Sequence, residues 1–555
     1  MANAIVDGFP ATSGDDYQLN IITFLRHAAR TFPEQEVASK RIDGSIYRSD
    51  YAKTYERVKQ MANALANLGV GPGDRVGVME WNTHRFFELY FAISGLGAVL
   101  LQLNPRISAD HLTHVINHSQ AKYICIAETM APVIENVAPG LESVEGYIFL
   151  TDSAIDDVQS KLAPMYGYEE LLQSASADLQ WPMINERSAY SACYTTGTTG
   201  MPKGVYYSHR NIYLHTMQFA NIGRICMDDV VMQIVPMFHA QGWGVFFTGP
   251  LTGAKLVLPG RYSLEDPSSL VDLMVSESVT ISCGAPAIFM PMLQYIQKMP
   301  EKPDLTGLRM FSGATEPPLS MMKGYWDLGK AQVIHAYGAT ETTPLVTFNA
   351  LKPSLRHLPE QQQWELKKKQ GLPVIGIEVK IADPEGNALP HDGKSVGELW
   401  IKGPWITTGY YSDARSEEAF QEGYWKSGDA ATIDEDGYIK ITDRIKDVIK
   451  SGGEWISSID LENTLMGHSM ILEAAVVGIA HPKWEERPLA LAVLSEQGRQ
   501  QISREDVYAF LGETFAKWQL PDEILFVEEI PKTSVGKFSK KQIRERYKDY
   551  YMQGG

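Results

Sequence analysis

The chain has 555 residues, of which 44% are hydrophobic and 21% are charged. This length exceeds the size at which a single hydrophobic core stops growing, so we expect at least two domains. The net charge of −17 argues against a nucleic acid or an anionic membrane surface as the main partner.

Cysteine usage and the N-terminus bear on the cellular compartment. The four cysteines are Cys125, Cys193, Cys226 and Cys283. They form no C-x-x-C pair, which disfavours a disulfide scaffold or zinc site and favours a reducing compartment. Residues 1–20 lack an apolar run, so no signal peptide is expected. The longest uncharged run, 230–254, contains prolines and glutamines, and it predicts a buried strand, a turn and a short helix. We therefore expect a soluble cytoplasmic protein without stable membrane insertion.

Helices and strands are predicted to alternate through the first part of the chain. Residues 49–68 have apolar side chains at helical spacing, with Ser49 as the expected N-cap and Gly69 as the stop. The next predicted elements are strands at 76–79, 98–101 and 123–126 and helices at 86–96 and 109–118. This alternation predicts a largely parallel sheet with helices on both faces.

The same pattern continues further along the chain and then changes. Further strands are predicted at 231–236, 255–258, 279–283, 310–311 and 332–335. From Pro373 the alternation of apolar and polar residues at 377–381 and 397–401 predicts antiparallel strands. The charged segment 360–369 is expected to be a solvated loop or helix face. A domain break is placed at 443–447, because roughly a hundred residues of α+β texture follow it.

One segment, 194–204, has the composition of a phosphate-binding loop. It contains four threonines, three glycines and Lys203, so it offers backbone N–H groups, hydroxyl donors and a point charge to a polyphosphate. It is not a Walker-A loop, because Pro202 stands where the second glycine belongs and Gly204 follows the lysine. The alternative interpretation is a flexible surface turn.

Three further segments carry candidate chemistry. Segment 337–342 follows a predicted strand directly, and Glu341 beside threonine hydroxyls suits a magnesium ion that bridges phosphates. In 425–429, Asp429 in a tight turn suits two ribose hydroxyls. Segment 531–540 presents lysines on a Gly/Ser loop. The alternatives are a strand-end turn, an Asx turn and a solvated tail.

Together and in this order, these segments resemble the adenylate-forming (AMP-binding) superfamily of acyl-CoA synthetases, luciferases and peptide-synthetase adenylation domains. The matching patterns are a Thr/Ser/Gly-rich loop ending in Pro-Lys-Gly, Tyr-Gly-x-Thr-Glu, Gly-Asp, Asp-Arg-x-Lys-Asp and a C-terminal Gly-Lys. The resemblance covers residues 20–550, and within the superfamily the chain looks like bacterial medium- or long-chain fatty acyl-CoA synthetases. It implies an α/β fold with a large N-terminal domain (1–443) of mainly parallel sheets flanked by helices plus a small antiparallel barrel-like part, a hinge (444–447), and a small mobile α+β domain (448–555).

The resemblance also implies roles for nucleotide-site residues. The ATP phosphates would be held by Thr195, Thr196, Gly197, Thr198, Thr199 and Lys203, with Thr195 and Glu341 near magnesium. The adenine and ribose pocket would be lined by Gly313, Ala314, His335, Ala336, Tyr337 and Gly338. Thr340 would reach the α-phosphate, and Asp429 with Arg444 would hold the ribose. Lys446 would be the hinge residue, and Lys450 and Trp455 would approach the nucleotide from the small domain.

The remaining implied roles concern catalysis, the acyl group and coenzyme A. The expected catalytic residues are Lys537, Thr340, Glu341 and His239. The acyl group would be bound by Phe238, His239, Trp243, Gly313 and Gly338, with Trp243 as the gate of an acyl tunnel. Coenzyme A would pass Ser451, Gly452 and Gly453. Glu316 departs from the family pattern, and it is expected either to face solvent or to limit or polarise the acyl site.

The implied activity is that of an AMP-forming acyl-CoA ligase with the substrates ATP, coenzyme A and a carboxylic acid, and with Mg²⁺ as cofactor. Phe238, Trp243, Phe246, Phe247 and residues 286–290 predict a hydrophobic acyl pocket that favours a medium- or long-chain acid. The alternatives are a CoA ligase for an alicyclic, aromatic or other short substituted acid, an acyl-AMP ligase with a non-CoA acceptor, and a non-catalytic binding scaffold. Segment 9–17 resembles an extension that pairs large domains in a bacterial relative, so a homodimer is expected.

Overall fold

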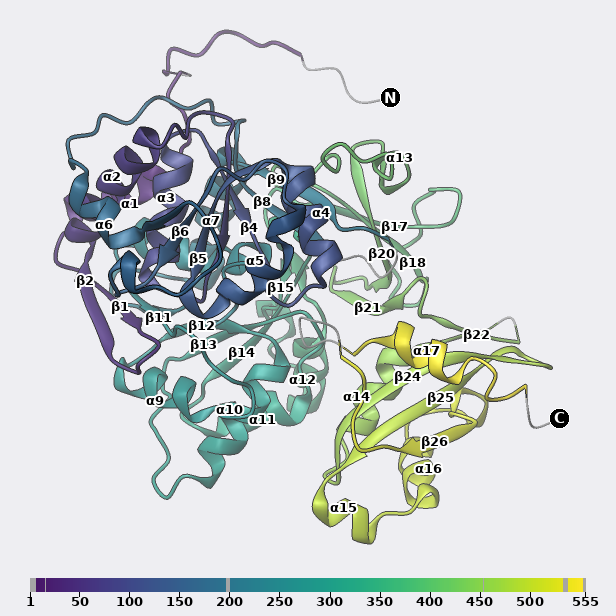
Figure 1. The fold of residues 1–555 in the computed structure, drawn as a ribbon. Coiled ribbons are helices and arrows are strands. Elements are labelled where there is room, and N and C mark those ends of the chain that lie inside the picture. The colour runs from purple at the N-terminus through teal and green to yellow at the C-terminus, as the bar shows by residue number, and fades with distance from the viewer. Residues whose placement is uncertain (1–5, 15, 196–199, 453, 533–537, 553–555) are drawn as a thin grey trace.

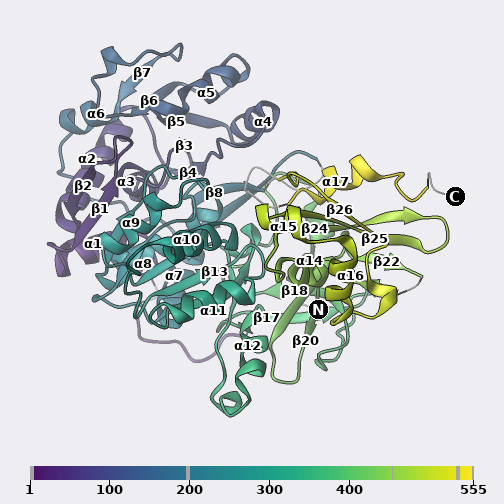
Figure 2. The same cartoon turned by 90° about the horizontal axis from the view of Figure 1, so that it is seen from below.

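The computed structural model describes residues 6–14, 16–195, 200–452, 454–532 and 538–552, with the backbone alone at 454 and 455. Four sheets organise the chain (Figure 1). Three belong to the large N-terminal domain, and the fourth belongs to the C-terminal domain. Figures 1 and 2 both place the C-terminal domain beside the antiparallel sheet of the large domain, away from β1 (Glu36–Lys40) and β2 (Ile46–Asp50).

The first sheet has seven strands in the order β7-β6-β5-β3-β4-β8-β9. All neighbours are parallel except β8 and β9. The strands are β3 (Arg75–Met79), β4 (Val99–Gln102), β5 (Ala121–Ala127), β6 (Gly146–Leu150), β7 (Met165–Gly167), β8 (Ala189–Thr195) and β9 (Lys203–Ser208). The helices around them are α1 (Ile22–Thr31), α2 (Tyr51–Asn67), α3 (His84–Gly95), α4 (Ala109–Ser119), α5 (Ala131–Val137), α6 (Tyr168–Ser174) and α7 (His209–Gly223), with short 3-10 turns η1 (Glu128–Met130), η2 (Ala138–Gly140) and η3 (Ile155–Asp157).

Helices cover both faces of this sheet because alternate strand residues point to opposite sides. On β3, Val76 and Val78 join the core that contains α2, α3 and α6, whereas Met79 joins the core that contains α4 and α5. Strands buried on both faces have near-continuous apolar sequences, as the sequence of β5 does. The predicted parallel α/β arrangement is confirmed.

The second sheet has nine strands in the order β16-β15-β14-β13-β12-β10-β11-β1-β2, and antiparallel pairs occur at its two ends only. Its further strands are β10 (Val230–Met232), β11 (Lys255–Leu258), β12 (Ile281–Gly284), β13 (Arg309–Ser312), β14 (Gln332–Gly338), β15 (Leu345–Phe348) and β16 (Leu372–Pro373). The associated helices are η4 (Ala240–Phe247), α8 (Thr248–Thr252), α9 (Ser268–Ser276), α10 (Pro286–Lys298), α11 (Leu319–Asp327), η5 (Thr340–Thr342), η6 (Pro353–Leu355) and α12 (Glu360–Lys368). One apolar core contains side chains of both large sheets, so these sheets share an interior layer of helices.

The third sheet, which is antiparallel, has the order β17-β18-β20-β19, and β21 pairs with β20. Its elements are β17 (Glu378–Ala382), β18 (Gly397–Lys402), α13 (Ser416–Ala419), β19 (Phe420–Gln421), β20 (Tyr424–Ile433) and β21 (Ile439–Arg444). The C-terminal domain contains β22 (Ile449–Ser451), β23 (Glu454–Ile456), α14 (Ser458–Met466), β24 (Ile471–His481), β25 (Glu485–Leu494), α15 (Glu496–Gln501), α16 (Arg504–Gly512), η7 (Lys517–Gln519), β26 (Glu523–Phe526) and α17 (Lys540–Tyr547). Two apolar cores lie on its sheet, and neither includes a residue before Ile449.

Some local predictions need correction. The N-cap of α2 is Asp50 rather than Ser49, because the Asp50 carboxylate accepts a hydrogen bond of 2.8 Å from the Lys53 N–H. The strand predicted at 231–236 ends at Met232, since the chain then turns toward η4. The run 230–254 forms a strand, a turn and short helices as predicted. No helix in the described ranges is both long and apolar enough to cross a membrane.

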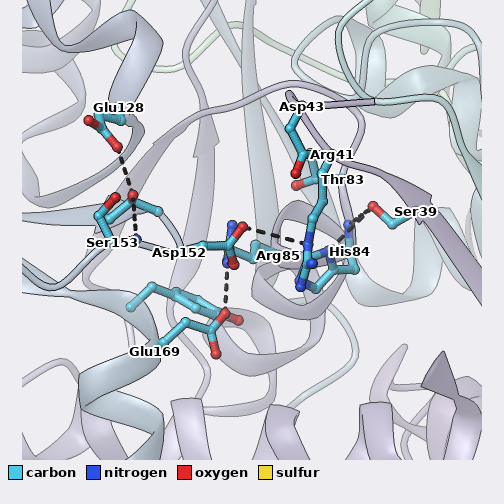
Figure 3. A network of polar contacts seen from close by, with 12 residues as sticks. Ser39, Arg41, Asp43, Thr83, His84, Arg85, Glu128, Asp152, Ser153 and Glu169 are labelled. Carbon is cyan, nitrogen blue, oxygen red and sulfur yellow. Dashed lines mark hydrogen bonds and ion pairs between the residues drawn. The ribbon is translucent and has the colours of Figure 1, made fainter. Parts of the chain in front are cut away.

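A polar network holds the helices of the first sheet together. Figure 3 shows Arg85 between Asp152 and Glu169. Next to this network, Arg57 of α2 binds both carboxylate oxygens of Glu88 on α3, at 2.7 and 3.0 Å, and also reaches Glu169 of α6. Glu88 is fully buried, so burial raises the pKa of its carboxyl while Arg57 opposes that rise.

Arg57→Ala is therefore expected to leave a buried carboxylate without its cation, at a cost of about 3–5 kcal/mol. Calorimetry should show a lower unfolding temperature for the large domain. Lys53→Ala is the matched control, because Lys53 lies one turn earlier on α2 with 72% of its side chain exposed. If both variants lowered the temperature equally, the buried pair would not be the reason for the loss.

Candidate active site

The predicted site residues lie beyond the carboxyl ends of parallel strands. Glu341 follows β14, Ala314 follows β13, His239 follows β10, and Thr195 ends β8. In open α/β sheets, ligands bind at this edge. The fold therefore gathers segments that are far apart in the sequence on one side of the two large sheets.

The first cluster lies at the exit of the Gly/Thr-rich segment. Thr195 and Lys203 face each other across β8 and β9. The Lys203 ammonium lies 3.8 Å from the ring centroid of Tyr410, whose hydroxyl donates a hydrogen bond of 2.8 Å to Glu341. Burial lowers the pKa of Lys203. Among the described residues, the buried hydroxyl of Thr195 has no hydrogen-bond partner. Residues 196–199 lie outside the described part.

Residues to which the sequence assigned no role position this cluster. The Tyr207 hydroxyl donates a hydrogen bond of 2.9 Å to the Thr340 carbonyl, and the Thr407 N–H donates one of 2.8 Å to the Glu341 carbonyl. Arg415 donates a hydrogen bond of 3.0 Å to the carbonyl of Met201 at the exit of the loop. Tyr410 belongs to none of the motifs recognised in the sequence, so no local pattern pointed to it.

The second cluster surrounds Asp429. This aspartate is 4% exposed, and its carboxylate accepts a hydrogen bond from the Tyr337 hydroxyl and pairs with Arg444 at 2.7 Å. Asp429 and Arg444 are cross-strand neighbours on β20 and β21. Burial, with a further contribution from Asp429, raises the pKa of Tyr337, so this hydroxyl remains a donor. A buried carboxylate whose orientation is fixed by two partners suits the binding of two vicinal hydroxyls.

Two glycines are required by close backbone approach. A Cβ at Gly338 would lie 1.6 Å from the carbonyl oxygen of Pro344. A Cβ at Gly313 would lie 2.8 Å from the carbonyl oxygen of Ala336 and 3.2 Å from the Trp243 ring. The ring of His335, by contrast, faces α12, where Nδ1 lies 2.6 Å from the Lys368 carbonyl oxygen, and burial lowers the pKa of His335 to about 4.

A cavity of about 300 Å³ adjoins these clusters. Its lining residues are Trp81, Arg106, Val235, Pro236, Phe238, His239, Trp243, Arg261, Tyr262, Ser263, Leu264, Ala285, Ala287, Ile288 and Ala314. The predicted acyl-site residues Phe238, His239 and Trp243 are thus brought together, whereas Gly313 and Gly338 are not among its lining. Trp81, Arg106 and the segment after β11 were missed, because they belong to none of the motifs.

The expectation that Phe246 and Phe247 line the acyl pocket is wrong. Both rings pack against Tyr90 of α3, with centroids 5.0 and 5.6 Å away, and lie in the core between the sheets. Helix α3 supplies further aromatic neighbours for both rings. Their burial is therefore explained by packing.

An unusual backbone turn forms one side of the cavity. Residues 240–244 all have positive φ, a conformation that costs roughly 1–2 kcal/mol for each residue with a side chain. The buried Gln233 offsets this cost, because its amide donates to the Val235 and Gly242 carbonyls and accepts from the Phe246 N–H. The turn places Trp243 between Gly313 and the cavity.

Glu316 is neither solvent-exposed nor part of this cavity lining. Its side chain is 6% exposed and accepts a hydrogen bond of 3.1 Å from Asn463 on α14 of the C-terminal domain. Lys368 lies 3.8 Å away, and Asp460 pairs with Lys440 of β21 beside it. The residue therefore lies at the contact between the two domains.

The predicted residues of the C-terminal domain are placed only in part. Lys450 is exposed and pairs with Trp455 across β22 and β23. The Ser451 hydroxyl accepts a hydrogen bond of 2.9 Å from Arg487, and the Gly452 N–H donates one of 2.9 Å to the Trp484 carbonyl. Gly453, Lys537 and the side chain of Trp455 lie outside the described residues. The role of Lys446 as a hinge stays a prediction.

Family models match most of the chain. The AMP-binding enzyme model matches residues 25–411, and the model of the AMP-binding enzyme C-terminal domain matches residues 460–537. The chain belongs to the AMP-binding enzyme family. The resemblance found in the sequence motifs, and the expectation of an enzyme, are confirmed.

Individual relatives of this AMP-binding enzyme are similar over nearly their whole length. A long-chain-fatty-acid–CoA ligase of Thermus thermophilus is 41% identical over 98% of each chain. A 3-methylmercaptopropionyl-CoA ligase of Ruegeria lacuscaerulensis is 38% identical over 96% of this chain and 98% of the relative. A medium-chain-fatty-acid–CoA ligase of Ectopseudomonas oleovorans is 37% identical over 96% of each chain. The crystal structure of the anthranilate CoA ligase AuaEII with anthranoyl-AMP matches the fold with a TM-score of 0.84, at 22% identity over 97% of this chain and 98% of that one.

The position of Glu316 predicts a pH-dependent domain contact. Burial raises its pKa to about 7, with Lys368 and Lys440 opposing and Asp460 and Glu365 adding to the rise. When the domains separate, the pKa should return toward its ordinary value of 4.5. As the pH rises, Glu316 therefore ionises at a lower pH when the domains are separated than when they are in contact. The domain contact is then strongest below about pH 4.5, weakens between about pH 4.5 and 7, and changes little above pH 7.

Glu316→Gln should remove this pH dependence, because the amide is neutral throughout and still bonds Asn463. Energy transfer between fluorophores on the two domains measures the contact across the pH range. Glu385→Gln serves as the control, since Glu385 is exposed and is not among the groups that shift the pKa of Glu316. An identical pH response in the wild type and Glu316→Gln would rule out Glu316 as the titrating group.

Proposed function

We propose that this AMP-binding enzyme is an ATP-dependent acyl-CoA ligase that activates a medium- or long-chain fatty acid. One observation carries the proposal. The largely apolar cavity with Phe238 and Trp243 meets the Asp429 and Glu341 clusters where β13 and β14 approach each other at Gly313. An acid in the cavity would thus have its carboxylate beside the nucleotide. The relatives with 37–41% identity are all named as ligases of an acid and CoA.

The first half-reaction would join two anions. The carboxylate attacks the α-phosphorus of ATP, pyrophosphate leaves, and an acyl-adenylate forms. Lys203 and the N–H groups of the loop would offset the negative charge, and one positioned donor of this kind typically contributes about 3–4 kcal/mol to the transition state. Thr340 would contact the α-phosphate.

The residues present fit a magnesium ion. Mg²⁺ in nucleotide sites usually takes one or two carboxylates and completes its shell with phosphate and water. Glu341 offers such a carboxylate, held by Tyr410, and the buried Thr195 hydroxyl has no described partner. When bound, the ion would neutralise part of the phosphate charge.

The second half-reaction would transfer the acyl group to the thiol of coenzyme A, with AMP as leaving group. We propose that the C-terminal domain rotates about 444–447 between the two steps, so that Lys537 serves the first and Ser451, Gly452 and Gly453 the second. The contact between the domains suits such motion. It includes polar pairs such as Lys440–Asp460 and Asp443–Ser458, which is typical of interfaces that open.

A second candidate function is the ligation of a short substituted acid. The cavity volume of about 300 Å³ is at the lower end of the usual range for ligand sites. The 3-methylmercaptopropionyl-CoA ligase is nearly as similar to this chain as the long-chain enzyme is. The two substrate classes are therefore to be distinguished by comparing the turnover of linear and short substituted acids.

We also propose a cytoplasmic homodimer formed through the N-terminal arm. Val6 and Phe9 are 88% and 99% exposed, so the arm has apolar side chains for a partner to cover. A monomer mass in light scattering at micromolar concentration would exclude the dimer.

Acyl chain length should decide the substrate class. Each methylene buried in the cavity contributes about 0.8 kcal/mol, so kcat/KM should rise about fourfold per methylene up to an optimum. AMP release with a series of linear acids, from acetate upward, measures this. Fastest turnover of acetate would contradict the fatty-acid proposal, and an optimum on a short substituted or cyclic acid would support the second candidate.

The two half-reactions should respond to different substitutions. Lys537→Ala is expected to slow adenylate formation by roughly 10²–10³-fold and to leave thioester formation from supplied acyl-adenylate nearly unchanged. Lys532→Ala is the matched control, because Lys532 precedes the same loop and pairs with Glu473. Lys446→Pro should do the opposite, since a stiffened hinge hinders rotation. Equal losses in both half-reactions for both variants would contradict the rotating domain.

A further inference from the structure

Two arginines reach the cavity from different sheets. Arg106 follows β4 of the seven-stranded sheet, and Arg261 follows β11 of the nine-stranded sheet. The Arg106 guanidinium lies 6.0 Å from the ring centroid of Phe238, and that of Arg261 lies 5.6 Å from that of Trp81. Both arginines are exposed, whereas Phe238 of the same cavity lining is buried. We call the part of the cavity that Arg106 and Arg261 line its outer end.

The backbone holds both arginines in place. The Gly260 N–H donates a hydrogen bond of 2.9 Å to the Asn82 carbonyl, which fixes Arg261 beside Trp81. The side chain of Asn82 is buried and bonds the carbonyls of residues 233–235 and the N–H of residue 237. On the other side, the Arg106 N–H donates a hydrogen bond of 3.0 Å to the Asn104 side chain. The two arginine side chains therefore extend from backbone segments that hydrogen bonds hold in place.

Neither guanidinium has an acidic partner within the described part of the chain. Among the described residues, the guanidinium groups of Arg106 and Arg261 form no ion pair and no hydrogen bond. By contrast, the guanidiniums of Arg48, Arg57 and Arg309 each bind a carboxylate. The chain has 67 acidic residues against 50 basic ones, so carboxylates are abundant on its surface. Two arginines that line one cavity without a carboxylate partner are therefore unusual in a protein with a net charge of −17.

We propose that the outer end of this cavity is a subsite for a second anionic group of the acid, so that the enzyme accepts α,ω-dicarboxylic acids. This proposal rests on the proposed function, since it places the reacting carboxylate at the other end, beside Trp243 and Ala314. The wall between the two ends is apolar, with Val235, Phe238 and Ile288, and takes the methylene chain. A guanidinium binds a carboxylate through two parallel hydrogen bonds, which a methyl end cannot accept.

The subsite would add selectivity without excluding plain fatty acids. Both guanidiniums are exposed, so they remain hydrated when the chain ends in a methyl group. Exposed ion pairs contribute modestly, so the preference over the matched monocarboxylic acid should be about two- to fivefold for each arginine.

The test compares kcat/KM for mono- and dicarboxylic acids of equal chain length over a series of lengths. The wild type should show the highest ratio of dicarboxylic to monocarboxylic acid at one length. Arg106→Gln and Arg261→Gln should each reduce that ratio, and the double variant should abolish the preference while retaining activity on the monocarboxylic acid. Arg499→Gln on α15, an exposed arginine of the C-terminal domain, is the matched control and should change nothing.

Other results would overturn the subsite. A ratio that is unchanged in the double variant would do so. An equal loss of kcat/KM on both acids would also do so if the difference between the variant and the wild type shrinks as salt is added. That result would mean that the arginines only attract carboxylates to the entrance. If no acid gives a thioester, the proposed function fails. In that case calorimetric binding of the same acid pairs to the full chain still tests the arginines, and the subsite fails if the double variant binds both members of a pair as the wild type does.

Discussion

The direction of the parallel strands is the constraint on which the rest of this structure depends. A right-handed crossover returns each strand to the same orientation, so the loops that follow parallel strands all leave at one edge of the sheet. Antiparallel neighbours occur only at the ends of the two large sheets. The residues after β3, β4, β10, β11, β12 and β13 consequently line one cavity. Thr195 at the end of β8 and Glu341 after β14 are connected through Lys203, which pairs with Thr195, and Tyr410, which contacts both Lys203 and Glu341.

Irregular loops at such an edge need buried polar partners, because their backbone groups lack a regular ladder. Gln233 and Asn82 provide these partners for the segment after β10. Together they hold the left-handed turn at 240–244 in a conformation that its sequence alone would disfavour. The shape of the cavity thus depends on two buried amides that are not among its lining residues.

The division into two domains has a different physical basis. The apolar cores of the C-terminal domain contain only residues from Ile449 onward, so each domain buries its own hydrophobic surface. The described contact between them includes several hydrogen bonds and ion pairs, among them those of Glu316 and Asp443. Such contacts exchange readily with water, so they suit a domain that serves two chemical steps in turn.

The sequence by itself determined the parallel α/β class, the antiparallel part, the family and the short motifs around Lys203, Glu341 and Asp429. These properties depend on local spacing, because a strand, a loop and its polar residues lie within a few positions of each other. Only the tertiary structure decided which distant residues complete the site. Tyr410 meets Glu341 across 69 positions, and Asn463 meets Glu316 across 147. Arg106 and Arg261 share a cavity because their two sheets pack together, and no local pattern in the sequence encodes that packing.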